Sequence, residues 1–106
     1  MWGTTVMRVE ITPNGYLILP AEEAARFPVG TAIALVRGDE LWLMRVSHPG
    51  GGGLLLKIRN PRGDRSVLVR ELLPEATEPG VREAFWDEEA GALRVPLAPA
   101  SQASQG

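Results

Sequence analysis

The stretch 14–46 constrains the fold most, because strand, helix and turn signals follow one another directly along it. Tyr16–Leu19 is a short β-prone run. Pro20 comes next and can begin a helix. The N–H groups of the first helical turn have no partner within the helix, so the missing N–H of proline costs nothing there. Phe27 precedes a second proline, and a residue in that position is driven out of the helical region. The stretch therefore predicts a strand followed by one short helix over Pro20–Arg26.

A hairpin is predicted after this helix. Gly30 marks the turn into the run Thr31–Val36. The pair Gly38-Asp39 then separates that run from Leu41–Val46, at the spacing of two antiparallel strands joined by a tight turn.

This order of elements resembles the AbrB/SpoVT family of swapped-hairpin proteins. The matching features are a glycine turn, a hydrophobic–proline pair, a short helix, a second glycine and a hairpin, at Gly15, Leu19-Pro20, Ala24-Ala25-Arg26, Val29-Gly30 and Gly38–Leu41. The resemblance is closest over residues 6–46. It implies an all-β fold, β-rich with one short helix, in the form of a swapped-hairpin barrel. The family usually carries a basic residue just after the first glycine, and this chain has Tyr16 there.

The same signals recur after the glycine-rich connector 47–53. The corresponding segments are Pro13-Asn14-Gly15 with Pro61-Arg62-Gly63, Tyr16–Leu19 with Ser66–Val69, Val29-Gly30 with Pro79-Gly80, and residues 33–46 with residues 84–97. We interpret this as an internal duplication, with halves 1–47 and 54–97 forming a single barrel domain, 1–97, that is followed by a disordered tail at 98–106. A duplicated chain is expected to be a monomer, and an ordinary half-barrel a homodimer. The alternative is that turns recur by coincidence, as they do in any β-barrel.

Neither half is long enough to bury its own apolar residues, because segments of about 40–50 residues rarely form a core alone. We therefore expect apolar residues of the first half to pack against those of the second. The pattern predicts these partners as Val6, Leu17, Leu35 and Leu43 on one side, and Leu55, Leu68, Phe85 and Leu93 on the other.

Composition narrows the classes of function. The 106-residue chain has a net charge of −2 and contains no cysteine, so disulfides and cysteine metal sites are excluded. The first residues lack the basic and apolar regions of a signal peptide, and no apolar run approaches the length of a membrane span. We expect a cytoplasmic protein without a membrane partner.

No catalytic constellation stands out. His48 is the only histidine, and it has no second histidine or cysteine with which to form a metal site. The acids at 87–89 are typical of an exposed hairpin turn. Serine and threonine have no nearby histidine to act as a base. The sequence therefore predicts a protein that is not an enzyme and has no cofactor, no metal and no catalytic residue.

The one basic cluster lies in residues 57–70, which contain four arginines and one lysine against a single acid, Asp64. Arginines on such turns can bind phosphates through their two-pronged guanidinium groups. A solvated hairpin edge is the other interpretation, since basic residues there discourage aggregation. The resemblance implies DNA contact from the first strands and the glycine turns. Together these arguments give Arg8, Arg26, Lys57, Arg59, Arg62 and Arg65 as candidate DNA-binding residues.

Three hypotheses of function follow, of which the third, a small-molecule or cofactor-accessory protein, has no evidence of a pocket in the sequence. The first is a small AbrB-like transcriptional regulator or antitoxin-like factor that binds duplex DNA. The second is an assembly module that binds another protein, uses the same barrel with the central hairpin as its docking surface, and does not bind nucleic acid.

Overall fold

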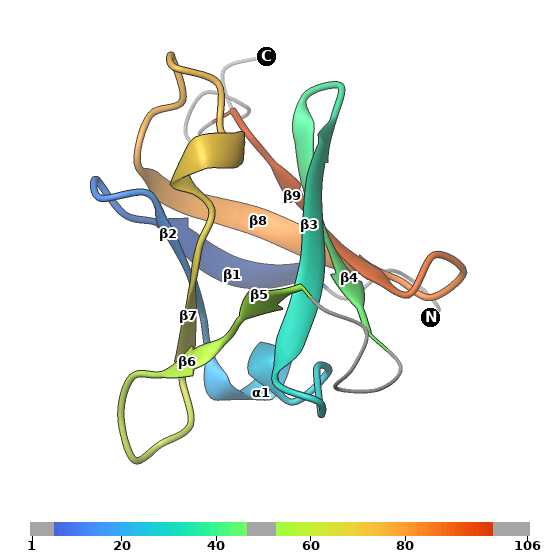
Figure 1. The fold of residues 1–106 in the computed structure, drawn as a ribbon. Helices are drawn as coiled ribbons and strands as arrows, with labels where there is room; N and C mark the ends of the chain where they lie inside the picture. Colours follow the sequence, from blue (N-terminus) through green and yellow to red (C-terminus); the bar gives the residue numbers. More distant parts are fainter. Residues whose placement is uncertain (1–5, 47–52, 99–106) are drawn as a thin grey trace.

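The computed structural model describes residues 6–46 and 53–98, which form one antiparallel nine-stranded sheet that curls into a nearly closed barrel (Figure 1). The strands in chain order are β1 (Val6–Ile11), β2 (Tyr16–Leu19), β3 (Thr31–Arg37), β4 (Glu40–Arg45), β5 (Leu54–Leu55), β6 (Lys57–Ile58), β7 (Arg65–Leu68), β8 (Gly80–Asp87) and β9 (Ala92–Pro96). An α-helix, α1 (Ala21–Ala24), follows β2, and a 3₁₀ helix, η2 (Arg70–Leu72), follows β7. The expectation of an all-β chain with one short helix is confirmed.

The helix is shorter than the predicted Pro20–Arg26. Pro20 caps α1 in an extended conformation, with ψ of 160°, and the helix ends after Ala24. The next residues form a tighter turn, in which the N–H of Arg26 donates to the carbonyl of Glu23. Phe27-Pro28 allows no further helical turn.

Strand order around the sheet is β5-β3-β4-β9-β8-β1-β2-β7-β6. Four of the antiparallel pairs are hairpins between neighbours in the chain, namely β1–β2, β3–β4, β6–β7 and β8–β9. The other four pairs, β1–β8, β2–β7, β3–β5 and β4–β9, each join a strand of residues 6–46 to a strand of residues 53–98. The sheet therefore cannot form from either segment alone.

The two edges of the sheet, β5 and β6, are consecutive in the chain and meet at Leu56. The sequence predicts one strand over Leu54–Arg59, but the segment pairs first with β3 and then with β7. Leu56 turns into the barrel at this change of partner, with 1% of its surface exposed, and its N–H donates to the carbonyl of Gly30 at 2.9 Å. This residue brings the two edges together.

The core fills the barrel with alternate residues of the strands. Of the eight expected core partners, Leu17, Leu43 and Leu93 are fully buried. The prediction was wrong for Val6 and Leu55, which are 61% and 60% exposed, and for Leu68, which is 41% exposed. Their neighbours in the chain face inward instead, because successive strand residues point to opposite faces. The buried residues on or next to those strands are Met7, Val9, Ile11, Leu56 and Val67.

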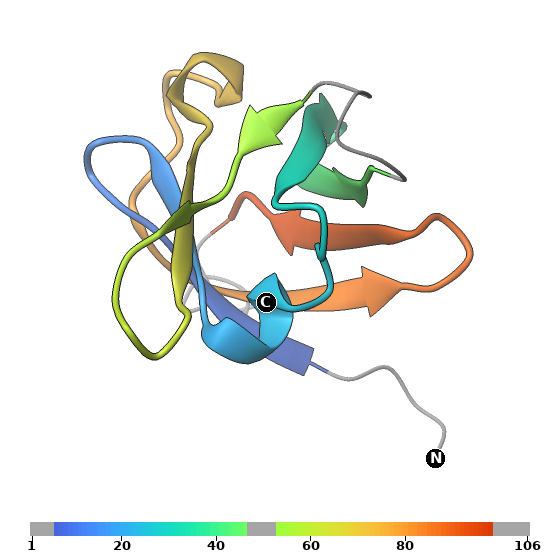
Figure 2. The ribbon, with the colours of Figure 1, turned by 60° about the horizontal axis from the view of Figure 1, so that its bottom comes forward.

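Helix α1 lies at one end of the barrel, the lower end in Figure 1. Figure 2 brings this end forward and shows α1 beside the hairpin β6–β7. Phe27 follows the helix and is buried, with its ring edge-on to that of Trp86 at 5.8 Å between centroids. The predicted connector 47–53 and tail 98–106 lie outside the described residues, apart from Gly53 and Ala98.

Candidate functional site

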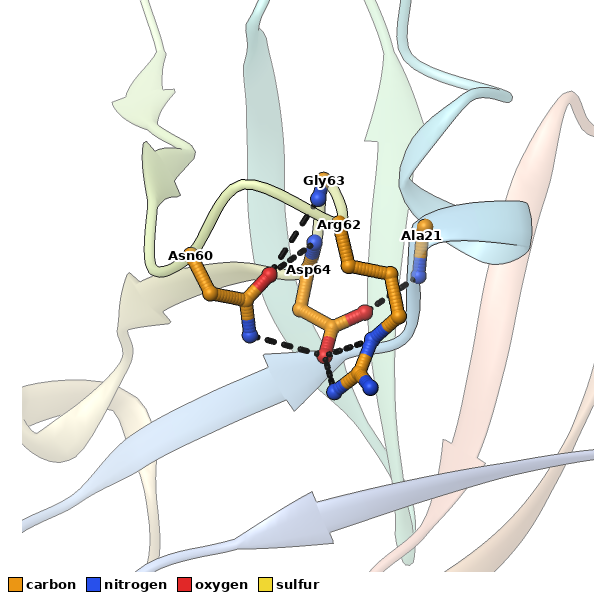
Figure 3. Close-up of polar contacts among 5 residues, drawn as sticks. All are labelled: Ala21, Asn60, Arg62, Gly63 and Asp64. Carbon is orange, nitrogen blue, oxygen red and sulfur yellow. Dashed lines mark hydrogen bonds and ion pairs between the residues drawn. The ribbon is translucent and has the colours of Figure 1, made fainter.

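The turn between β6 and β7 is held by a hydrogen-bond network around Asp64 (Figure 3). The amide oxygen of Asn60 accepts the N–H groups of Gly63 and Asp64, both at 3.2 Å, and its amide nitrogen donates to Asp64 Oδ2 at 3.1 Å. Arg62 donates to the same oxygen from Nε at 3.2 Å and from Nη2 at 2.7 Å. Gly63 takes a φ of +105°, a region that glycine adopts without strain. The turn therefore has a fixed shape.

Asp64 also fastens this turn to helix α1. Its Oδ1 accepts the N–H of Ala21 at 2.8 Å, across 43 residues of sequence. A carboxylate in this place satisfies one of the N–H groups that a helix start leaves unbonded. Hydrogen bonds from Arg62 and Asn60, with that of Ala21, lower the pKa of Asp64 from 3.8 to about 2. The Arg-Gly-Asp turn thus has an internal structural role.

Asp64 is expected to contribute a pH-dependent part of the stability. Its pKa in the folded protein lies below the ordinary value, so the contribution is present above about pH 4 and is lost as the pH falls to about 2. Urea denaturation at about pH 5 and about pH 2.5 measures this loss. Asp64→Asn should show a smaller decrease between the two conditions than the wild type. Equal decreases would show that other carboxylates account for the acid sensitivity.

The hairpin β6–β7 gathers four of the six candidate DNA-binding residues. Lys57 and Arg59 are exposed, and the Arg62 side chain is 75% exposed despite its pairing with Asp64. Arg65 is half-buried, and its Nη1 donates to the carbonyl of Leu56 at 3.2 Å. Arg65 therefore supports the place where β5 passes into β6. Lys57 and Arg59 are free to contact a ligand, whereas Nε and Nη2 of Arg62 are bonded to Asp64.

The remaining two candidates lie on other elements. Arg8, on β1, is 77% exposed and lies 4.0 Å from Glu83, a loose surface pair. The guanidinium of Arg26, after α1, lies over the ring of Trp86 at 5.2 Å from its centroid. An open depression of about 220 Å³ is lined by Arg8 together with Glu10 and Asp64.

Arg70 was not among the predicted site residues, although it belongs to the basic cluster. Its Nη1 donates to the carbonyl of Asn14 at 3.3 Å, so it lies against the other glycine turn, Thr12–Gly15. Fifty-six residues separate the two partners in sequence. The sequence shows that a basic residue is present at position 70 but not where it lies. The pairing of β2 with β7 brings it to that turn.

No group of three or more histidine, aspartate or glutamate side chains in residues 6–46 and 53–98 is placed to hold a metal ion. His48 lies outside the described residues. Within the same part of the chain, no helix is long and apolar enough to cross a membrane. Comparisons of the chain with family models, curated proteins and solved structures found no match.

Proposed function

We propose that the chain is an internally duplicated, AbrB-like swapped-hairpin barrel without enzymatic activity. Strand pairing supports this proposal. When each residue is replaced by its counterpart in the other half, residues that pair on neighbouring strands are replaced by residues that also pair. The exchange relates Leu41–Val95 to Leu93–Leu43, Tyr16–Leu68 to Ser66–Ile18, and Val36–Leu41 to Trp86–Leu93. Gly30 and Gly80 correspond in the same way, and both have positive φ, at 87° and 139°.

We propose duplex DNA as the partner of this barrel. The observation that carries the proposal is the fixed hairpin β6–β7, on which Lys57 and Arg59 are exposed. Arg62, although paired with Asp64, keeps 75% of its side-chain surface exposed. The one acid in the turn, Asp64, is already bonded to Arg62, Asn60 and the start of α1. Basic side chains on a rigid turn can meet phosphates without a further cost of ordering the backbone.

The first glycine turn, Thr12–Gly15, extends the proposed surface. It lies at the other end of the pair β2–β7 and carries Arg70 beside Asn14. An arginine at each turn suits a ligand with repeated phosphates. Because the net charge of the chain is −2, the attraction of DNA to the protein is local to these turns. The transcriptional-regulator role and the antitoxin-like role both require this DNA binding.

The test is binding of a fluorescent 20-base-pair duplex over a series of salt concentrations. Three phosphate contacts give a slope of about −3 in log K against log salt, since each contact contributes about −0.9. The double variant Lys57→Gln, Arg59→Gln should bind more weakly and flatten the slope by about two units. Arg37→Gln, on the far hairpin, is the control and should bind as the wild type does. If the wild type does not bind at physiological salt, the regulator proposal fails.

The second candidate function is protein binding, and one observation favours it. Aliphatic side chains stand exposed on the outer face of the barrel, including Ile58 at 68%, Val6 at 61% and Val81 at 46%. Exposed apolar side chains on a rigid sheet are typical of docking surfaces. Ile33, on the central hairpin proposed for docking, is 42% exposed as well. Retention of a partner without any affinity for DNA would favour this function.

A further inference from the structure

The barrel holds two clusters in which a pair of arginines lies over a tryptophan ring. In the Trp42 cluster, the guanidinium carbons of Arg37 and Arg94 are 4.7 and 4.6 Å from the ring centroid. In the Trp86 cluster, those of Arg26 and Arg45 are 5.2 and 4.9 Å from the centroid. The two clusters therefore have similar cations at similar distances from similar rings.

The Trp42 cluster contains its own anions. Glu40 Oε1 accepts hydrogen bonds from the indole Nε1 of Trp42 at 3.0 Å and from Arg94 Nε at 2.9 Å. Asp87 Oδ2 accepts a second donor of Arg94, Nη1, at 3.1 Å. A carboxylate thus joins the indole N–H to the guanidinium. The indole N–H and the guanidinium of Arg94 therefore both have carboxylate partners.

The Trp86 cluster has the same donors without the anions. No described acid forms a salt bridge with Arg26 or Arg45. The indole Nε1 of Trp86 is buried and has no hydrogen-bond partner among the described groups. The segments outside the described residues, 1–5, 47–52 and 99–106, contain no aspartate or glutamate that could serve.

Two cations on one ring repel each other, and a buried N–H without an acceptor is uncommon in folded proteins. An oxyanion at this place would offset the repulsion and accept charge-assisted hydrogen bonds from the guanidinium groups. Trp86 itself is only 8% exposed, because Phe27 and the two arginines pack around it, so the cluster is built on a rigid ring.

We propose that Arg26, Arg45 and Trp86 form a binding site for a carboxylate of an acidic protein segment. A carboxylate is favoured because carboxylates already pair with Arg94 beside the Trp42 ring. At Trp86 the exposed Arg45 and the half-buried Arg26 are the groups that a ligand would meet, since the indole Nε1 is buried. Arg26 is also one of the six candidate DNA-binding residues, but the site uses neither Lys57 nor Arg59, so its test does not depend on the hairpin that carries the DNA proposal. An acidic segment is the kind of protein partner that this site would give to the assembly-module function.

The experiment is an NMR titration that follows the indole Nε1–H resonances of Trp42 and Trp86. The probes are an N-acetylated tetraglutamate amide, acetate, inorganic phosphate and a 20-base-pair duplex, at ionic strength matched with sodium chloride. The peptide should shift the Trp86 resonance saturably and leave that of Trp42 in place. Arg26→Gln and Arg45→Gln should each raise the dissociation constant at least tenfold, whereas Arg37→Gln should leave it unchanged.

The other probes distinguish the source of the anion. Tighter binding of the peptide than of acetate supports an acidic segment, and equal binding per carboxylate overturns the segment in favour of a small acid. Shifts by phosphate or duplex DNA without any by the peptide would overturn the proposal. So would a peptide-induced shift that persists in Arg26→Gln and Arg45→Gln. Circular dichroism of each variant confirms that the barrel is folded before the titration.

Discussion

Replacing Arg82 with alanine is expected to lower the free energy of unfolding by about 3–5 kcal/mol, from lost packing and unsatisfied carbonyls. Arg82 is fully buried in β8, and no acid forms a salt bridge with it in the described part of the chain. Its Nε and Nη2 donate to the carbonyl of Leu97 at 3.1 and 2.8 Å, and Nη2 also donates to the carbonyl of Glu78.

This arginine joins the end of β9 to the loop before β8. Burial lowers the pKa of its guanidinium, which remains charged because arginine ordinarily titrates far above neutral pH. Alanine leaves a cavity and two carbonyls without their donors. Arg82→Met fills the cavity but supplies no donor, so it should recover only part of the loss. Guanidinium chloride denaturation measures both variants, and a methionine variant as stable as the wild type would contradict the role assigned to the hydrogen bonds.

Replacing Gly15 with alanine is expected to cost roughly 3–5 kcal/mol, from strain at its backbone and a clash with η2. Gly15 has a φ of +87°, and a Cβ there would lie 2.4 Å from Cβ and 2.9 Å from Cα of Arg70. The contact lies between the first glycine turn and the start of η2, so it cannot relax without moving one of the two halves.

The matched control is Gly38→Ala. Gly38 also has a positive φ, +61°, but a Cβ there would meet nothing within 4 Å. Its cost should be about 1 kcal/mol, that of the backbone conformation alone. Thermal denaturation of the two variants compares them directly. Equal losses would show that η2 moves away without cost and that the close approach of the halves does not contribute to stability.

The local elements could be predicted because their signals are local. Gly38-Asp39 defines the turn between β3 and β4, and Pro20 with Phe27-Pro28 bounds the helix to within two residues at either end. The basic hairpin was found for the same reason, since Lys57, Arg59 and Arg62 are close in sequence. The DNA contacts themselves stay a prediction.

For several strands, the pattern of apolar residues did not predict which alternate side chains point into the core. In β7, both Val67 and its neighbour Leu68 are apolar, so either alternate set could form the core, and the structure buries Val67. In β1 the pattern does favour the buried set, because the set that begins at Val6 continues with Arg8 and Glu10. Arg82 gave no sign that it is internal, because charged residues are rarely buried and its acceptors are backbone carbonyls. The Trp86 cluster was also missed, since Arg26, Arg45 and Trp86 are far apart in the chain.

The sequence by itself determined where this chain turns and which segments extend, because glycine, proline and β-branched residues act on the backbone within a few positions of themselves. Only the tertiary structure decided which strands pair, that Leu56 brings the two edges of the sheet together, and that Asp64 bonds to the start of α1. These contacts join residues tens of positions apart, and their energy depends on register, which shifts every side chain to the other face when it slips by one residue.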